Sequence, residues 1–590
     1  MHLTALDWVI VALSLAVTFV PAVVLARRAG KNTAEFFAAG RQAPWWLIGI
    51  SLVATTFSTD TPNLVTNLVR DGGVAENWVW WAFLLTGMTT VFFYARLWRR
   101  SGVLTDLEFY ELRYSGREAS FVRGFRAVYL GLFFNCVIIA SVNLAAAKIA
   151  SVLFGWPEWL TLAACGLVPI LFAAVGGLWG VMVTDLLQFC ITMTSAIAAA
   201  YVAIHLPQVG GLHGLLAQVR AAHPGMLAIL PNFHDWKTAA AIFVIPLAVQ
   251  WWSVWYPGAE PGGGSYVAQR MLAARSERDA QWGTLLFQAM HYALRPWPWI
   301  LVALASTIVF PTLASIHARF PAVQPSLLGN DIAYPAMLTF LPAGFAGFMV
   351  AGLFAAYRST LETHLNWGTS YLVHDLYRRF IRPGRDERHY VIAGRWVTAL
   401  LMLCGIGVTF LMGTAKAFFD LMLSIGAGTG LIYLLRWFWW RINAWSEIAA
   451  MCASLVVAVA QRVLDARGVP IDPATGLLWS VGLTTAAWLA VTFLTPPVDR
   501  AVLRRFCERV RPGGPGWRAV AADLTSPAAD RPTLAIAGWV LGLLGIYGLL
   551  FGTGAVLYGN RLGAVLALAV VAAAVVGLGR IAQVAWAGAR

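Results

Sequence analysis

The sequence contains little charge for its length. Asp, Glu, Lys and Arg make up 12% of its 590 residues, whereas 59% are hydrophobic, and the mean hydropathy is +0.69. Soluble domains carry about twice this share of charged residues, so the composition excludes an ordinary soluble protein. The alternating apolar and polar pattern of β-strands is not evident either. We therefore expect an all-α polytopic membrane protein.

Other signals are absent as well. The six cysteines are scattered and form no CxxC pair, so we expect neither a disulfide nor a metal cluster. Gly262–Gly264 lack the lysine pattern of a phosphate loop, and no nucleophile–base pair is visible. The first apolar segment has no basic leader and no cleavage site, and is predicted to be a retained helix. These absences argue against an enzyme and against an organic cofactor.

Long apolar runs are present instead. About fifteen of them recur, each about 20 residues long, which is the length that a helix needs to cross a bilayer. Arg and Lys gather in alternate loops, at 27–41, 96–126, 378–395 and 500–531. By the positive-inside rule these loops face the cytoplasm, which puts the N-terminus outside and the C-terminus inside a bacterial-type plasma membrane. The net charge of +14 then reflects an anionic inner leaflet rather than nucleic-acid binding.

Polar residues in the middle of the apolar run 350–380 carry the strongest functional signal. Ser359, Thr360 and Thr363 lie there beside small residues. Hydrocarbon offers no hydrogen-bond partners, so hydroxyl groups at this depth must face protein, water or a bound ion. They are candidates for the oxygen cage of a small hard cation. The alternative is that Ser359 and Thr360 only bond back to carbonyls of their own helix.

A second run, ISLVATTFSTDTPN at 50–63, is predicted to break. Pro62 removes a backbone donor, and the Ser and Thr residues before it compete for backbone hydrogen bonds. A broken helix near the midplane frees carbonyl oxygens, which transporters use to hold sodium. A simple proline kink remains the alternative.

Asp185 lies inside the apolar run that follows GGLWG. A carboxylate within the membrane is costly unless it is paired or solvated, so Asp185 is a candidate station on the path of a cation. It could instead be an acid at a helix N-terminus, where the helix dipole favours it.

Several motifs, in order and in register, resemble the sodium:solute symporter family, which includes sodium–sugar, sodium–proline and sodium–sialic acid symporters. They are EFFAAGR (35–41), LTDLEFYELRY (104–114), GGLWGVMVTDLLQ (176–188), YVAQRMLAARSERDAQWG (266–283), GLFAAYRSTL (352–361) and RWFWWRINAW (436–445). The resemblance covers roughly residues 1–450.

The resemblance implies a LeuT-like core of two inverted repeats of five helices, with its sites near the midplane. We expect this core at 44–437, with the first repeat at 44–206 and the second at 238–437. An N-terminal helix and loop at 1–43 would precede the core. Four further helices at 438–590, with a cytoplasmic loop at 496–532, would follow it.

The resemblance also implies a sodium site between the broken helix and the 350–380 helix. Its ligands would be the carbonyls of Ala54, Phe57 and Ala356 and the hydroxyls of Ser359 and Thr360. Such oxygen ligands suit a hard monovalent ion. In the family, an inward-path carboxylate corresponds to Asp185.

Two departures from the family pattern complicate this reading. Arg358 precedes the hydroxyl pair, where an apolar residue is usual, and needs a partner such as Glu362, Asp60 or Asp185. Glu362 and Thr363 stand where members with a second sodium site carry serines. Glu362 could strengthen cation binding, or Arg358 could replace the second cation.

The family positions that line the solute site supply a set of candidates. They are Thr56, Ser58, Asp60, Trp80, Trp81, Gln250, Trp251, Trp255 and His291. Trp80 stands where sugar carriers hold an acid, which weakens a sugar assignment. Asp60 could equally pair with Arg70 or Lys148, and many of the 28 tryptophans belong to the interfacial belt.

We therefore expect a sodium-coupled secondary symporter that imports a small polar organic solute by alternating access. Its partners would be the solute, the sodium ion and the lipid bilayer. A proton-coupled or cation-independent carrier, with Arg358 in place of a cation, is the first alternative. A transporter-like sensor of a solute is the second.

Overall fold

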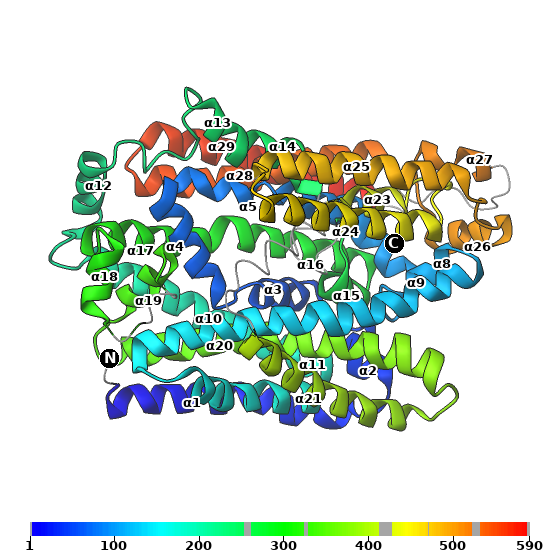
Figure 1. Cartoon of the computed structure of the whole chain (residues 1–590), viewed down its shortest axis with the longest axis horizontal. Helices are drawn as coiled ribbons and strands as arrows, with labels where there is room; N and C mark the ends of the chain where they lie inside the picture. Colours follow the sequence, from blue (N-terminus) through cyan, green and yellow to red (C-terminus); the bar gives the residue numbers. More distant parts are fainter. Residues whose placement is uncertain are drawn as a thin grey trace.

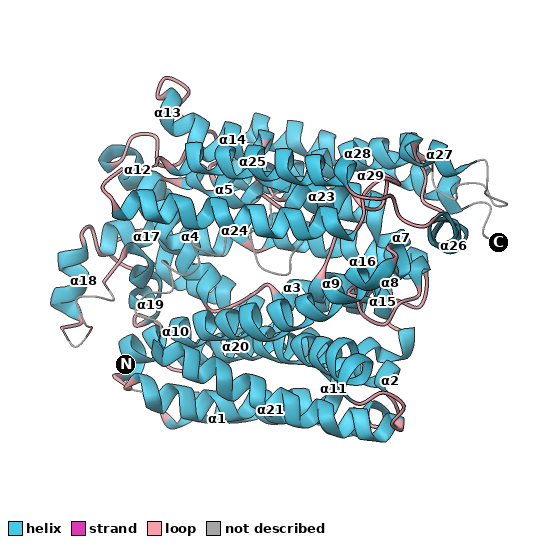
Figure 2. Cartoon of the chain, turned by 45° about the vertical axis from the view of Figure 1, so that its right-hand side comes forward, coloured by secondary structure: helices cyan, strands magenta, loops and turns pink. Residues whose placement is uncertain are grey.

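The computed structural model describes residues 3–252, 261–321, 323, 328–411, 428–469, 471–521 and 531–586. Apart from one isolated bridge between Ala43 and Ala274, its regular structure over these ranges is helical, as Figure 2 shows. The helices as far as the loop before residue 261 are α1 (Ala5–Ala29), α2 (Thr33–Ala38), α3 (Trp45–Thr55), α4 (Asp60–Gly72), α5 (Trp78–Trp81), α6 (Leu84–Thr89), α7 (Ala95–Ser101), α8 (Glu108–Arg113), α9 (Gly116–Val128), α10 (Asn135–Phe154), α11 (Glu158–Ile204), α12 (Gly211–Ala222), α13 (Trp236–Ala239) and α14 (Ile245–Ala248).

The remaining helices begin with the segment after residue 261. They are α15 (Ser265–Ala273), α16 (Glu277–Ala289), the π-helical turn η7 (Met290–Leu294), α17 (Pro296–Val309), α18 (Leu313–Arg319), α19 (Ala333–Leu338), α20 (Phe345–Ser370), its π-helical continuation η10 (Tyr371–Ile381), α21 (Glu387–Leu411), α23 (Gly430–Leu435), α24 (Ala444–Ala466), α25 (Pro473–Leu494), α26 (Arg500–Val510), α27 (Arg518–Ala521), α28 (Pro532–Leu557) and α29 (Arg561–Trp586).

Most of the long helices run along one common direction and form an elongated bundle (Figure 1). On one side lie α1, α11, α20 and α21, and α11 packs against α1, α3 and α20. On the opposite side lie two helix pairs, α24 with α25 and α28 with α29. Between these sides lie α3, α10 and α16, so the short helix α3 is enclosed by longer ones.

Ten helical stretches in the described part of the chain are long and apolar enough to cross a membrane. The predicted number of about fifteen spans is therefore not confirmed. For two of the predicted spans, α3 and α20, there is a physical reason why they are not among these ten stretches. The helix α3 has only 11 residues, and α20 contains Arg358 and Glu362 near its middle, which lowers its hydropathy.

The predicted break at 50–63 is present. Helix α3 ends at Thr55 and α4 begins at Asp60. The hydroxyls of Thr55 and Thr56 donate to the carbonyls of Ser51 and Leu52, and so occupy acceptors at the end of α3. Pro62 falls in the first turn of α4, where a missing backbone donor costs no helical hydrogen bond. The chain is thus broken rather than merely kinked.

Helix α11 is interrupted at Gly177, where the backbone leaves helical geometry with φ +53°. A Cβ atom here would come within 3.0 Å of Ala29 and of the carbonyl of Phe36. The positive φ and the close approach both require glycine. Two membrane helices, rather than one of 47 residues, therefore meet at this point.

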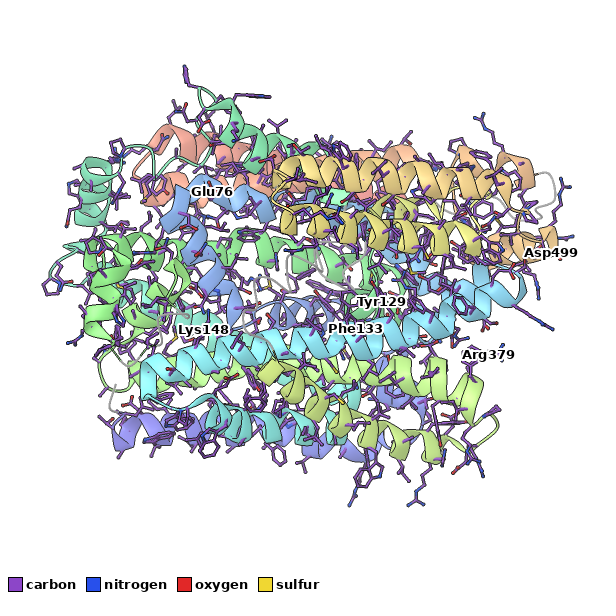
Figure 3. All side chains as sticks on the ribbon, in the orientation of Figure 1. Glu76, Tyr129, Phe133, Lys148, Arg379 and Asp499 are labelled. Atoms are coloured by element: carbon purple, nitrogen blue, oxygen red, sulfur yellow. The ribbon has the colours of Figure 1, made fainter. Side chains whose placement is uncertain are left out.

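Charged side chains link the elements at one end of the bundle. Arg123 on α9 pairs with Asp375 on η10 at 2.7 Å and with Glu111 on α8 at 2.6 Å. Glu108 on α8 contacts His374 on η10. Figure 3 labels Arg379 and Asp499 at this end and Lys148 in the other half of the molecule. The basic loops that the sequence analysis predicted to face inward gather at this end (Figure 1).

Burial raises the pKa of Glu108, but the hydrogen bond from His374 and the charges of His374 and Arg123 outweigh it. The net effect lowers the pKa of Glu108 to about 2. Glu108 therefore stays ionised and ties α8 to η10 at neutral pH.

Candidate functional site

Helix α20 meets the break after α3 through hydroxyl groups. The hydroxyl of Thr360 lies 2.9 Å from the carbonyl oxygen of Thr55 and 3.2 Å from that of Ala356. The hydroxyls of Thr55 and Thr363 lie 2.9 Å apart. All these groups are buried. The bonding of Thr360 is therefore not confined to its own helix, because its shorter contact crosses to the broken one.

The predicted sodium ligands lie on these two elements. Ala54 is the last residue but one of α3, and its carbonyl accepts from the backbone N–H of Phe57 at 3.0 Å, so the chain turns tightly there. Ala356 is one turn before Thr360 on α20. These ligands are carbonyl and hydroxyl oxygens, the type of ligand that hard cations prefer. The residues present therefore fit a small hard cation.

Ser359, the other predicted ligand, faces a carboxylate. Its hydroxyl donates to Asp185 Oδ1 at 2.6 Å, and the hydroxyl of Ser51 donates to Oδ2 at 2.6 Å. Asp185 is fully buried and lies eight residues beyond the interruption at Gly177. This position is past the first turn of the second half of α11, so the helix dipole does not account for it.

An arginine that the sequence analysis did not select lies in the same cluster. Arg270 on α15 is fully buried, and its Nη2 donates to the hydroxyl of Thr363 at 2.7 Å. Its Nε lies 3.3 Å from Ser51 Oγ, and Nη2 lies 3.9 Å from Asp185 Oδ2. The apolar residues on both sides of Arg270 in YVAQRML were the available signal that it does not face water.

Arg358 points away from the predicted sodium ligands. Its Nε lies 2.7 Å from Glu362 Oε1, and its Nη1 donates to the hydroxyl of Thr18 on α1 at 3.0 Å. The guanidinium covers the ring of Phe172 at 3.6 Å from the centroid. Of the predicted partners, Glu362 is the one that forms a close ion pair with Arg358.

Gln188 connects this ion pair to Asp185. In the amide orientation that satisfies both neighbours, its oxygen accepts from Arg358 Nε and Nη2 at 2.8 Å. Its nitrogen then donates to Asp185 Oδ1 at 3.2 Å. A continuous polar network therefore runs from α1 to α3 through the middle of the bundle.

Three of the predicted solute-site residues form a second cluster after α3. The hydroxyl of Thr56 lies 3.1 Å from His291 Nδ1, and the ring of Trp80 lies 5.9 Å from that of His291. Arg295, which the sequence analysis did not select, donates to Thr56 Oγ1 at 3.0 Å and to the Val53 carbonyl at 3.2 Å. This cluster combines an aromatic face with hydrogen-bonding groups, as polar solutes require.

The other predicted solute-site residues are less closely associated. Trp81 is fully buried and its carbonyl accepts from Tyr547 on α28. Gln250 lies 3.5 Å from the Val79 carbonyl, and Trp251 contacts Thr86 through its own carbonyl. Ser58 is buried near the break. Trp255 lies outside the described residues.

Asp60 is not the partner of the two basic residues proposed for it. Arg70 donates to Asn330 at 3.0 Å and to the Phe310 carbonyl at 2.8 Å, whereas Lys148 pairs with Asp331 at 3.3 Å. The pairing of Asp60 with Arg70 or Lys148 is not supported, because both basic side chains have these other partners. Asp60 begins α4, next to the helix break.

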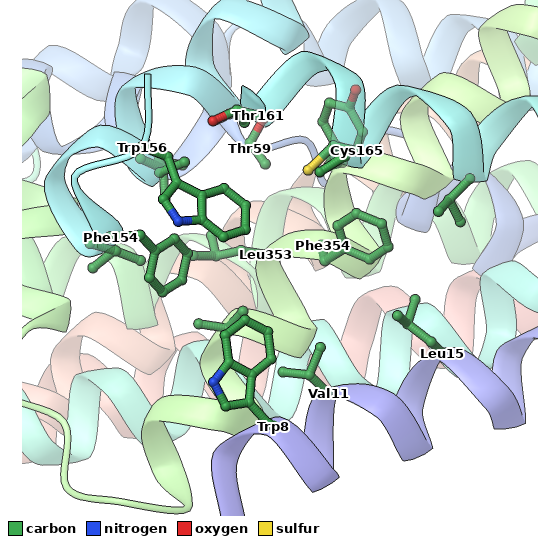
Figure 4. Close-up of a pocket in the computed structure, with 18 residues that line it drawn as sticks. Trp8, Val11, Leu15, Thr59, Phe154, Trp156, Thr161, Cys165, Leu353 and Phe354 are labelled. Atoms are coloured by element: carbon green, nitrogen blue, oxygen red, sulfur yellow. The ribbon is translucent and has the colours of Figure 1, made fainter. Parts of the chain in front are cut away.

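An apolar cavity of about 270 Å³ lies between α1, α10, α11 and α20 (Figure 4). Trp8, Phe154, Trp156 and Phe354 line it, and Thr59 reaches it from the helix break. Its lining is almost entirely hydrophobic and contains no charged group. Such a cavity cannot orient a polar solute, so the cluster of Thr56, Trp80 and His291 is the better candidate.

Comparison with known proteins gives consistent results. Residues 36–456 match the sequence model of the family described as "Sodium:solute symporter family". The chain is 26% identical over 441 residues to the sodium/glucose cotransporter of Vibrio parahaemolyticus, covering 73% of this chain and 79% of that protein. It is 26% identical to the sodium/myo-inositol cotransporter of Bos taurus, covering 80% of this chain and 70% of that protein.

A solved structure shares the fold. It is described as the substrate-bound outward-open state of a Na+-coupled sialic acid symporter, with a TM-score of 0.68 at 18% identity. The match covers 84% of this chain and 99% of that one. At this identity the likeness concerns the fold, and it confirms the predicted LeuT-like, all-helical class.

Proposed function

Because this chain belongs to the sodium:solute symporter family, we propose that it imports a small polar organic solute together with sodium. Proteins of this family are multi-pass membrane transporters and not enzymes. Sodium is accordingly the coupling ion expected here, and each charge that moves inward down 100 mV releases about 2.3 kcal/mol. Alternating access between the two sides of the membrane would join this energy to the movement of the solute.

One observation supports the sodium site most strongly. The hydroxyl of Thr360 on α20 touches the carbonyl of Thr55, one residue after Ala54 in the broken helix. We propose that sodium binds here, to the carbonyls of Ala54, Phe57 and Ala356 and the hydroxyls of Ser359 and Thr360. Because the ligands come from two elements, the ion would hold α3 and α20 together and stabilise one of the two access states.

Asp185 and the contacts around it support a route for the ion toward the cytoplasm. The carboxylate binds Ser359 on one side and Ser51 on the other, directly beside the proposed ligands. We propose that sodium leaves its site past this carboxylate.

For the solute, we propose the cluster of Thr56, Trp80 and His291 as the contact surface, and Ser58, Asp60, Gln250 and Trp251 as further candidates. The relatives named above are cotransporters of glucose and of myo-inositol. A polyhydroxylated compound would suit a ring face beside hydrogen-bonding groups. Trp81, which packs toward α28, is the weakest of the original candidates.

One observation favours a second function, a carrier that needs no cation. Arg270 brings a fixed positive charge to 3.9 Å from Asp185. In such a carrier the guanidinium of Arg270 would supply the positive charge that sodium supplies in a symporter.

The experiment that separates the two functions has two steps. Thermal-shift screening of the purified protein against sugars, polyols, amino acids, nucleosides and carboxylates, with and without sodium, first identifies the solute. Counterflow of that solute in proteoliposomes is then measured in sodium and in sodium-free buffer at several pH values. Sodium-dependent counterflow supports the symporter, whereas full activity without sodium at every pH contradicts it.

We also propose that the protein resides in the plasma membrane with its N-terminus outside and its C-terminus in the cytoplasm. The basic residues gathered at the end of the bundle that holds Arg379 support this orientation (Figure 3).

A further inference from the structure

Four charged side chains form a buried cluster beside the proposed sodium site. Asp185, Arg270, Arg358 and Glu362 come from α11, α15 and α20, and none exposes more than 1% of its surface. Asp185 interacts electrostatically with both arginines, and Arg358 with both acids. The cluster therefore behaves as one electrostatic unit.

The formal charges of this cluster sum to zero. Buried ions in a medium of low dielectric constant must be neutralised, because an uncompensated charge carries a large desolvation cost. Arg358 neutralises Glu362 across 2.7 Å and reaches Asp185 through Gln188. Arg270 supplies the second positive charge on the other side of Asp185.

The two arginines therefore neutralise both carboxylates, and no net negative charge remains in the cluster to attract a mobile cation. The proposed sodium ligands are carbonyl and hydroxyl oxygens, so the first ion binds without drawing on either carboxylate. A second ion would have to compete with a guanidinium that is already in contact with Glu362. The hydrogen bond to Thr18 and the contact with Phe172 hold Arg358 in this position.

We propose that Arg358 acts as a built-in cation which limits this protein to one sodium ion. This inference rests on the proposed function, and it makes Arg358 a residue that determines the ion stoichiometry rather than a sodium ligand. Removing the guanidinium leaves Glu362 and Asp185 with only Arg270, a net charge of −1 in the bundle interior. That charge creates a site for a second cation.

Equilibrium binding of radioactive sodium to the purified full-length protein tests the proposal without knowledge of the solute. The wild type is expected to bind one ion. R358Q is expected to bind two, whereas the double variant R358Q/E362Q, in which the charge is balanced again, is expected to bind one ion with near wild-type affinity. E362Q leaves an uncompensated arginine and is expected to weaken sodium binding by about tenfold or more.

The outcomes distinguish a failure of this proposal from a failure of the proposed function on which it rests. A wild type that binds two ions, or an R358Q that is folded by size-exclusion and thermal-shift criteria and binds one, overturns the role of Arg358 while sodium coupling stands. If R358Q does not fold, the wild-type count and the E362Q affinity still decide, and unchanged affinity in E362Q contradicts the proposal. A wild type that binds no sodium overturns the proposed function itself.

Discussion

At the scale of single residues, hydroxyl groups have the central role. Ser359 and Thr360 are adjacent on α20 and their side chains go to different partners, a carboxylate and a backbone carbonyl. Adjacent helical residues point about 100° apart, so one pair of hydroxyls can serve two neighbouring elements. This arrangement places one hydroxyl against α11 and the other against the end of α3.

Ser359→Ala and Thr360→Ala are expected to raise the sodium concentration for half-maximal uptake by about tenfold or more, because a contact with a charged group contributes about 1.5–3 kcal/mol. Sodium titration of uptake in proteoliposomes measures the shift. Thr194→Ala is the matched control, since Thr194 is exposed and donates to Cys190 in its own helix. An unchanged sodium dependence in both variants would remove these residues from the site.

His291→Ala separates the solute cluster from the ion site. His291 contacts Thr56 and Trp80 but none of the proposed sodium ligands. We expect the solute concentration for half-maximal uptake to rise by about tenfold, as the loss of one to two hydrogen bonds predicts. Sodium binding measured without solute should stay at the wild-type value. A loss of sodium binding with unchanged solute affinity would show that His291 belongs to the ion site and not to the solute cluster.

At the scale of elements, charged groups fix helices to one another at the end of the bundle that holds Arg123. Glu447 on α24 is fully buried, accepts from Tyr114 at 2.6 Å and lies 3.5 Å from Arg436. It ties the first C-terminal helix to the core. Glu108 does the same for α8 and η10 through His374.

Glu447→Gln should cost about 3 kcal/mol or more of stability, because removing one member of a buried ion pair is strongly destabilising. A fall in the thermal unfolding midpoint of the purified protein reports this loss. Glu508→Gln breaks the exposed pair with Arg504 and should change stability by about 1 kcal/mol or less. Equal effects of the two changes would show that α24 is held by packing alone.

The pH dependence of stability follows from Glu108. Its pKa is lowered to about 2 by His374 and Arg123 in spite of burial, so its ionised form stabilises the fold. The stabilisation is complete above the unfolded pKa of about 4.3 and disappears as pH falls toward 2. Glu108→Gln should therefore lower the unfolding midpoint at pH 7, and its difference from wild type should shrink below about pH 4. Glu118→Gln, on α9 outside this contact, is the control. A difference that grows in acid would contradict this account.

The sequence predicts elements better than it predicts their contacts. Pro62 and the preceding hydroxyl residues indicate the break after α3, and the structure has it. The polar groups of the 350–380 run are buried, as hydrocarbon requires. Arg270 and Arg295 were missed. Their burial depends on neighbours that are distant in the sequence, such as Thr363 and Val53.

At the scale of the whole molecule, the span count shows a limit of hydropathy. A functional helix that carries polar groups is less apolar than a structural one, so α20 is not among the ten apolar stretches although it lies inside the bundle. The division into a core at 44–437 and added helices at 438–590 stays a prediction.

The central claim is that sodium binds where the end of α3 meets α20. The most direct measurement is a pair of high-resolution structures of the full-length protein, one in sodium and one with potassium as the only monovalent metal ion. The account predicts density bounded by the carbonyls of Ala54, Phe57 and Ala356 and the hydroxyls of Ser359 and Thr360, present in sodium alone. Identical density in both salts, or a sodium ion elsewhere in the bundle, would contradict it.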